Sequence, residues 1–544
     1  MFCFNDFKLS LHRIELEIVL LSLHFLASFA STENQDPECI SYDDDKTTCS
    51  FIDVLSNHNF ISALLKKREP LASIKRINLM NCYLDEVSYL IVEVYPNVEV
   101  IDVSENALIV LNFSEFNNNR LRVIDASNNY IRSIDLSNLV AFTNLESLDV
   151  SYNRIQRITP DKIAYNPKFK FLNLSHNQLT RLDMHVLNTF RSLEILHLDH
   201  NLIKEISGNF RDFKPNWKEL YLQNNTLQTL NLLLVRSVSI LNVTNNQISV
   251  AKFHDSNITK LMISKNQLKI LTLSENLELL EAADNEGNMV DIDFTSNKKL
   301  KHLNLSGMKI ETSKAILDTI TSFQNLTYLN LNYIQFKLLQ GMFDKLVQLE
   351  VLKIRDFSHE GENLPKNTFN HMKELIELDL GLILFDTFDL RALGEMRNLE
   401  SLDIHDCCIT DLVGWKNITE FFPKFKRINM IYNEFLSEEL KEMIEDFEKK
   451  GIEIVKLKEY GVEDFVFESS RDIKYSYIDH NDNEERIHVK ARHHGDHSDK
   501  QHYSYIGRIV GITLAIIFVS GAFVFAQKRF NFCTRTNQSR RFNN

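Results

Sequence analysis

The stretch LESLDVSYNRI at residues 145–155 decides the fold of this chain, because its pattern returns along most of the sequence. The next copy, FKFLNLSHNQL at 169–179, begins 24 residues later, and LEILHLDHNLI at 193–203 follows after another 24. The shared pattern is L-x-x-L-x-L-x-x-N-x-L, counted here from its first apolar residue as position one. A fixed period of this length predicts a chain built from stacked structural repeats.

We place position one of the successive copies at sixteen residues, which are spaced 19 to 26 apart: Ile74, Val98, Leu121, Leu145, Phe169, Leu193, Trp217, Val238, Ile258, Leu277, Leu300, Leu326, Leu349, Leu375, Leu399 and Phe425. The pattern resembles the signature of leucine-rich repeats. Within each copy, apolar and polar residues alternate as in a half-buried strand. We therefore expect an α/β leucine-rich-repeat solenoid, a horseshoe with a parallel concave β-sheet, plus a single transmembrane helix.

Position nine is expected to turn inward, where an asparagine amide can satisfy backbone groups of neighbouring repeats. A buried ladder is thus predicted from the asparagines that occupy this position: Asn106, Asn129, Asn153, Asn177, Asn201, Asn225, Asn246, Asn266, Asn285 and Asn433.

Two apolar segments predict how the chain relates to a membrane. Residues 509–526 contain no charge and would extend about 27 Å as a helix, enough to cross the hydrocarbon layer. All charged residues that follow this segment are basic, which predicts a cytoplasmic C-terminus. The apolar run 18–29 predicts a secretory signal removed near Ala30, with an uncleaved anchor as the alternative.

These features divide the chain into seven parts: a signal peptide at 1–30, an N-terminal cap at 31–73, about 16 repeats at 74–435, a C-terminal cap at 436–458, a polar, histidine-rich stalk at 459–505, a transmembrane helix at 506–527 and a cytoplasmic tail at 528–544. In the C-terminal cap we expect a helix with Ser437 as N-cap, ended by Gly451, and then a last strand. The formal charge is −13 and the tail contributes +5, so residues 1–527 carry −18. An acidic ectodomain argues against nucleic acid as ligand.

The cysteines have distinct expected roles. Cys39 and Cys49 precede the first repeat, where the open end of the core needs a cap, and should form a disulfide in an oxidising compartment. Cys82 and Cys407 occupy position nine of their repeats and are predicted to be buried structural thiols. Cys408 adjoins that position, so it is a candidate for an intermolecular disulfide or a solvent-facing thiol.

Eight sequons predict N-glycosylation: Asn112, Asn173, Asn224, Asn242, Asn257, Asn304, Asn325 and Asn417. Three of them fall at position five, on the expected concave sheet, where sugar would obstruct part of the face. The candidate ligand-binding residues on that face form two clusters. The first is a row of aspartates in consecutive repeats, Asp102, Asp125 and Asp149, and the second is the pair Asp379 and Asp403 beside Lys353 and Arg355. Like charges on adjacent strands cost stability, so the aspartates either await a cationic partner or form a solvated face.

The repeat array, the cysteine cap and the single span together resemble extracellular leucine-rich-repeat receptors of animals. The asparagine-rich form looks like insect members, namely Toll-type ectodomains and the leucine-rich immune proteins of mosquitoes. Those immune proteins end in a cap N-x-W-x-C-x-x-L, and the matching stretch here is NEFLSEEL at 433–440. Phe435 replaces the tryptophan and Ser437 the cysteine, so that cap disulfide is absent. A tail of about 18 residues is too short for a Toll-type signalling domain.

The sequence therefore predicts a single-pass type I plasma-membrane protein that binds a protein or microbial-surface ligand as receptor or co-receptor, with a role in innate immune recognition. A homophilic or heterophilic adhesion protein and a shed extracellular immune factor are the alternatives. Small residues spaced by four at 507, 511 and 515 favour homo- or hetero-dimers in the membrane. No motif of an enzyme, a cofactor or a metal site occurs, and the six stalk histidines form only a loose cluster.

Overall fold

The computed structural model describes residues 39–40, 47–51, 60–62, 64, 71–112, 116, 120–136, 139, 142–159, 166–187, 190–208, 217–230, 232–285, 287, 291–294, 297–310, 314–336, 338–339, 341–356, 364 and 368–455. All of them belong to one compact unit. The predicted signal peptide, stalk, transmembrane helix and tail lie outside the described residues. Within the described part, we find no helix that is both long and apolar enough to cross a membrane.

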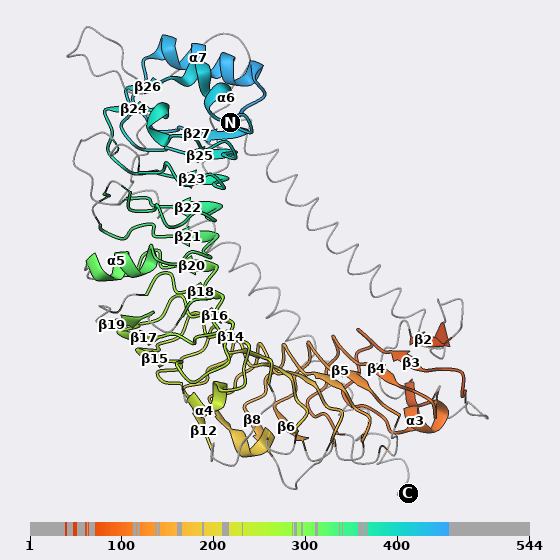
Figure 1. Cartoon of the computed structure of the whole chain (residues 1–544). Coiled ribbons are helices and arrows are strands. Elements are labelled where there is room, and N and C mark those ends of the chain that lie inside the picture. The colour runs from red at the N-terminus through yellow and green to blue at the C-terminus, as the bar shows by residue number, and fades with distance from the viewer. Residues whose placement is uncertain are drawn as a thin grey trace, which may run out of the picture. The chain divides into compact units, whose positions relative to one another are not determined.

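One long β-sheet organises this unit (Figure 1), and each repeat adds a strand to it. Neighbouring strands pair in chain order and run parallel, except that β1 is antiparallel to β2. The 19 strands are β1 Cys39–Ile40, β2 Thr48–Phe51, β3 Arg76–Asn78, β4 Val100–Asp102, β5 Val123–Asp125, β7 Ser147–Asp149, β9 Phe171–Asn173, β11 Ile195–His197, β13 Glu219–Tyr221, β14 Ile240–Asn242, β16 Lys260–Met262, β18 Leu279–Glu281, β20 His302–Asn304, β21 Tyr328–Asn330, β22 Val351–Lys353, β23 Glu377–Asp379, β25 Ser401–Asp403, β27 Arg427–Asn429 and β28 Glu453–Ile454. The predicted parallel sheet is confirmed.

The other elements connect these strands. Four smaller parallel sheets pair β6 Ser133–Asp135 with β8 Arg157–Thr159, β10 Arg181–Asp183 with β12 Glu205–Ser207, β17 Ile270–Thr272 with both β15 Val250–Lys252 and β19 Asp291–Asp293, and β24 Thr387–Asp389 with β26 Asp411–Val413. The helices are α3 Leu90–Val94, η2 Met184–Leu187, α4 Leu232–Val235, α5 Lys314–Ile320, η3 Leu390–Leu393, η4 Trp415–Asn417, α6 Ile418–Phe421 and α7 Ser437–Lys449.

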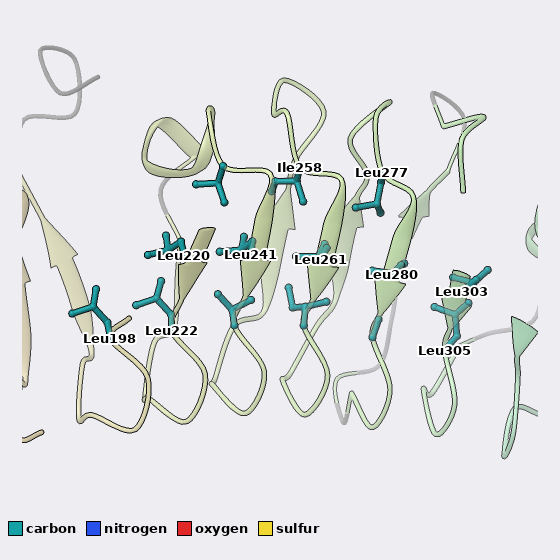
Figure 2. Packing of buried hydrophobic residues seen from close by; sticks show 14 of the residues in the cluster. Leu198, Leu220, Leu222, Leu241, Ile258, Leu261, Leu277, Leu280, Leu303 and Leu305 are labelled. Atoms are coloured by element: carbon teal, nitrogen blue, oxygen red, sulfur yellow. The ribbon is translucent and has the colours of Figure 1, made fainter. Parts of the chain in front are cut away.

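The core lies behind the long sheet and is built from columns of equivalent residues. The middle residue of each strand points inward, as the alternation predicts, and neighbouring repeats place these residues side by side (Figure 2), as for Leu220, Leu241, Leu261, Leu280 and Leu303. All of the predicted position-one residues are buried. Burying each such side chain stabilises the fold by about 1.5–3 kcal/mol, and stacking makes this burial possible because a single repeat has nothing to cover its apolar face.

The predicted asparagine ladder is also confirmed, since all ten asparagines are at most 8% exposed. In Asn153, Nδ2 donates to the carbonyls of Ala126, Val150 and Ser151, while Oδ1 accepts from the amide of Ile131. The preceding residue takes a left-handed backbone conformation, as in Tyr152 with φ 51°. Cys82 and Cys407 fill the same position as buried thiols, as predicted, and Cys407 Sγ donates to the carbonyls of Leu380 and His405 at 3.3 Å.

The C-terminal end of the array is covered by α7 and β28. The buried face of α7 carries Met443 and Phe447, and the Phe447 ring meets Trp415 edge to face with centroids 6.1 Å apart. Gly451 follows the helix with φ 72°, which suits a residue without a Cβ. Leu436, rather than Ser437, takes the N-cap position, and it makes no side-chain cap. The predicted N-cap was therefore one residue too late, because a serine beside a glutamate pair looks like a cap in sequence.

Candidate ligand-binding face

Position five of the repeats lies on the outer face of the long sheet, at the end of each strand. Where it is aspartate or asparagine, its Oδ1 accepts a hydrogen bond from the backbone amide two residues on, which closes a local turn. The donors for Asp102, Asp125 and Asp149 are the amides of Ser104, Ser127 and Ser151, at 3.0, 2.9 and 2.8 Å. The repeat therefore requires a short side chain with an acceptor oxygen here, but it does not require a charge.

Three consecutive repeats nevertheless carry a negative charge at this position. Asp102, Asp125 and Asp149 lie opposite one another on β4, β5 and β7, all half-buried. Burial raises the pKa of Asp125, and the charges of Asp149 and Asp102 add to the rise against the hydrogen bonds from Ser127. In the described part of the chain, no basic side chain forms an ion pair with any of these three aspartates. We call these three residues the acidic row.

The second predicted cluster has its charges paired within the chain. Arg355 Nε donates to Asp379 at 2.7 Å and Arg355 Nη2 donates to Asp403 at 2.9 Å, while Lys353 Nζ lies 2.7 Å from Glu377. Burial raises the pKa of Asp379 despite the hydrogen bond from Arg355. Thus the structure brings Arg355, Asp379 and Asp403 together as one internal network, far along the array from the acidic row.

Charges beside the acidic row are paired as well. Position two alternates in sign over seven repeats, from Lys75 to Lys218, and its members form ion pairs across neighbouring strands. The Arg122 guanidinium donates two hydrogen bonds to Glu146, at 3.0 and 3.1 Å, and also contacts Glu99. The acidic row thus stands beside a ladder whose charges are paired with one another. Its outer neighbours at position three are the half-buried Val100 and Val123.

The eight predicted glycosylation sites fall into two groups. Asn112, Asn257, Asn325 and Asn417 are exposed, while Asn173, Asn224, Asn242 and Asn304 are half-buried. The position-five members of the second group use their amides on the sheet. Asn173 Nδ2 donates to Asp149 at 2.9 Å and Asn304 Nδ2 donates to Glu281 at 2.6 Å. Their N-x-S/T spacing coincides with the Asx turn of the repeat, so the turn explains these sequons without a glycan.

The remaining cysteines were also candidate sites. Cys49 is disulfide-bonded, and β1 places Cys39 on the strand next to it, opposite Phe51. The assignment of Cys39 as the bonded partner stays a prediction. Cys408 is half-buried and lies in a left-handed turn, with φ 55°.

Sequence reasoning missed a second polar site, at position eight. The rings of Tyr152, His176 and His200 stack there at centroid distances of 4.0 Å, beside an open hollow of about 560 Å³. Burial, and then the neighbouring His200, lower the pKa of His176. The buried carboxyl of Asp199 lies next to the stack, and its two histidine neighbours lower its pKa although burial opposes them. Histidine at one position of two consecutive repeats was the available signal.

A family model described as leucine rich repeat matches residues 119–179 and again 143–203. No curated protein matches the chain. The leucine-rich-repeat protein LIC12759 of Leptospira interrogans is similar in structure, with 19% identity, coverage of 74% of this chain and 99% of that one, and a TM-score of 0.51. The functional domain of InlJ from Listeria monocytogenes is 16% identical in sequence, with a TM-score of 0.42. The match covers 66% of this chain and 74% of that one. TLR13 in its complex with ssRNA13 is 18% identical in sequence, with a TM-score of 0.39. The match covers 74% of this chain and 68% of that one.

The two scores below 0.5 carry no argument about this chain. The sequence match and the likeness to the Leptospira protein agree with the stacked strands described above. Together they show that the described part of this chain is a leucine-rich-repeat solenoid.

Proposed function

We propose that this chain is a cell-surface binding protein, a receptor or co-receptor that recognises a cationic protein or microbial-surface ligand through the acidic row. The solenoid is a scaffold that presents side chains on an extended sheet, and no catalytic chemistry is proposed for it. A role in innate immune recognition and a type I orientation in the plasma membrane belong to the same proposal.

The acidic row is the observation that carries the proposal. Everywhere along the neighbouring ladder, and in the Arg355 network, charges on adjacent strands are paired. The charges of Asp102, Asp125 and Asp149 are not paired in the described part of the chain. The turn does not need these charges, because asparagine closes the same turn at Asn173. Three like charges on neighbouring strands cost folding free energy that a basic ligand would recover. Val100 and Val123 add an apolar surface next to these charges.

The test uses the triple variant Asp102→Asn, Asp125→Asn and Asp149→Asn in the full-length chain. Asparagine keeps Oδ1 and hence the turn, but each change also creates an N-x-S sequon. All proteins are therefore produced in bacterial cells, which do not attach these glycans, so that only charge is removed. The probe is an oligolysine peptide, with oligoglutamate as the negative probe. Each ion pair between a lysine of the peptide and an aspartate of the acidic row contributes about 0.5 kcal/mol, so losing three of them should weaken oligolysine binding about tenfold.

The matched control replaces three exposed aspartates outside the long sheet, by Asp318→Asn, Asp344→Asn and Asp386→Asn. This variant has the same net charge as the first and should bind as the parent does. Equal binding by the parent and both variants would refute the acidic row as the ligand site. Equal weakening in both variants would mean that only net charge matters.

The proposal favours a different molecule, rather than a second copy, as the partner. Two acidic rows facing each other would repel, so this face does not suit homophilic adhesion. Cells that express the chain should therefore remain dispersed when mixed only with one another. Aggregation that survives the triple Asp→Asn substitution would support the adhesion alternative through some other face.

The membrane orientation needs its own test. Cells expressing the chain with a C-terminal epitope are treated with an external protease before and after permeabilisation. The solenoid should be digested in intact cells, while the epitope survives until the membrane is opened. Protection of the solenoid in intact cells would refute the type I orientation. A solenoid recovered from the medium would instead support the shed factor.

A further inference from the structure

The stacked histidines at position eight lie next to a carboxylate that the fold leaves incompletely satisfied. His176 and His200 come from consecutive repeats, and their rings are 4.0 Å apart with 12° between their planes. Asp199 precedes His200 in the chain and is 7% exposed. One ligand atom from each of His176, Asp199 and His200 lies within 4.8 Å of the other two.

The two carboxylate oxygens of Asp199 differ in their surroundings. Oδ2 lies 2.9 Å from His200 Nδ1. Oδ1 is buried, and its one recorded side-chain contact among the described residues is a long one, 3.5 Å to His197 Nδ1. A buried carboxylate oxygen without a donor costs free energy. A cation at this oxygen would remove that cost.

We propose that His176, Asp199 and His200 bind one zinc ion. Two imidazole nitrogens and one carboxylate oxygen are a donor set that zinc accepts, with a fourth position left for water. The open hollow beside the stack provides the entry path and the room for that water. The site lies in the turns after β9 and β11, so it is separate from the acidic row and does not depend on the proposed function.

Binding requires a local rearrangement that the hollow can accommodate. Zinc bonds of about 2.0–2.2 Å place tetrahedral ligand atoms roughly 3.3–3.6 Å apart, so the cluster must contract. An ion lies in the plane of each imidazole that binds it, and two parallel stacked rings cannot both satisfy this condition. The His176 ring therefore has to rotate out of its stack on Tyr152 and His200, which gives up two ring contacts.

The neighbouring repeat holds the second histidine in place. Asn224 Nδ2 lies 2.8 Å from His200 Nε2, and Asn224 Oδ1 accepts a hydrogen bond from Asn245 at 2.7 Å. These contacts direct His200 Nδ1 toward Asp199. When zinc replaces the proton on Nδ1, the neutral ring carries its proton on Nε2, and a turned-over Asn224 amide can accept it.

The experiment is a calorimetric titration of the full-length chain with Zn²⁺ alone. Two background changes remove confounding sites. The six histidines between 480 and 502 are replaced by glutamine, since they could bind zinc themselves, and Thr226→Ala removes the sequon at Asn224 without changing Asn224. We expect one zinc ion per chain in this parent.

Three single substitutions then test the ligands: His176→Phe, Asp199→Asn and His200→Asn. His176→Phe keeps a ring in the stack but removes the nitrogen, so its fold is expected to be retained. Each change should weaken binding at least roughly 100-fold, because even outer-shell contacts account for 10- to 100-fold. His302→Gln is the matched control, a histidine on strand β20 of the long sheet that stacks on Tyr328, and it should bind zinc like the parent.

The proposal is overturned if the parent shows no saturable zinc binding. It is also overturned if folded His176→Phe binds with the parent's affinity, or if His302→Gln weakens binding as much as the three ligand substitutions do.

Discussion

Replacing Asn177 by alanine tests how much the asparagine ladder contributes to the fold. Its Nδ2 donates to the carbonyls of Val150, Leu174 and Ser175 at 3.0–3.1 Å, and its Oδ1 accepts from the amide of Ile155 at 2.8 Å. All three carbonyls keep another donor when Asn177 is lost, because Val150 also accepts from Asn153, Leu174 from Asn201 and Ser175 from the amide of Tyr152.

The loss is therefore concentrated on one group, the buried amide of Ile155. Leaving a buried donor without an acceptor costs about 1–3 kcal/mol, and the missing hydrogen bonds and volume add to it. We expect Asn177→Ala to lower the free energy of unfolding by about 2–4 kcal/mol. Asn177→Cys should lose less, since Cys407 makes hydrogen bonds to two carbonyls from the equivalent position.

Equilibrium unfolding in urea, followed by circular dichroism, measures these differences. The exposed neighbour Gln178 provides the control, and Gln178→Ala should change stability by less than about 0.5 kcal/mol. A loss below about 1 kcal/mol for Asn177→Ala would refute the reasoning. It would mean that water or a local shift satisfies the Ile155 amide.

Four further predictions follow from the geometry. Arg355→Leu should lower the free energy of unfolding in urea by about 3 kcal/mol or more, because the buried Asp379 loses its cation. Adding Asp379→Leu should restore part of the lost stability, and no recovery in the double variant would contradict the pairing. Asp125→Asn should raise the melting temperature at pH 7, because the raised pKa of Asp125 means that folding disfavours its ionised form. This increase in melting temperature should shrink as the pH falls through that pKa, since the wild-type carboxyl is then protonated. An increase that grows in acid would contradict the direction of the pKa shift. Glycopeptide mass spectrometry of the chain from secretory cells should find sugar at the exposed Asn257, Asn325 and Asn417 more fully than at Asn173 and Asn304, which are half-buried on the sheet, and the opposite ranking would contradict this. Peptide mapping without reduction should recover Cys39 linked to Cys49, and a mixed disulfide with any other cysteine would disprove the pairing.

Much of the fold could be predicted because the repeat places equivalent residues in equivalent surroundings. Position one, the strand alternation and the asparagines at position nine can each be read many times, so one irregular copy does not hide the pattern. The thiols of Cys82 and Cys407 were predictable for the same reason. The α7 boundary was less so, because a terminal cap occurs once and has no second copy to compare with.

The candidate sites were only partly predictable. The sequence placed Asp102, Asp125, Asp379 and Asp403 on the outer face, with Lys353 and Arg355 beside the second pair, but it did not establish which aspartates are paired. Only the structure distinguishes the aspartates that Arg355 pairs from those in the acidic row, because pairing depends on where a long side chain reaches across two strands. The structure also shows that the side chain at position five closes a turn. This turn explains why aspartate or asparagine occurs there and why some of these asparagines belong to sequons.

By itself the sequence determined the repeat, its register, the inward columns and the buried ladder, because these depend on local alternation and on a period that stacking requires. The tertiary structure decided which side chains of different repeats meet. His176 and Asp199 are 23 residues apart, and Arg355 and Asp403 are 48 apart, yet each pair is brought together because neighbouring parallel strands lie only about 4.8 Å from one another. These distances between neighbouring strands decide whether a charged group is paired, is exposed to solvent or has an oxygen without a close hydrogen-bond donor. The sequence pattern does not contain these distances.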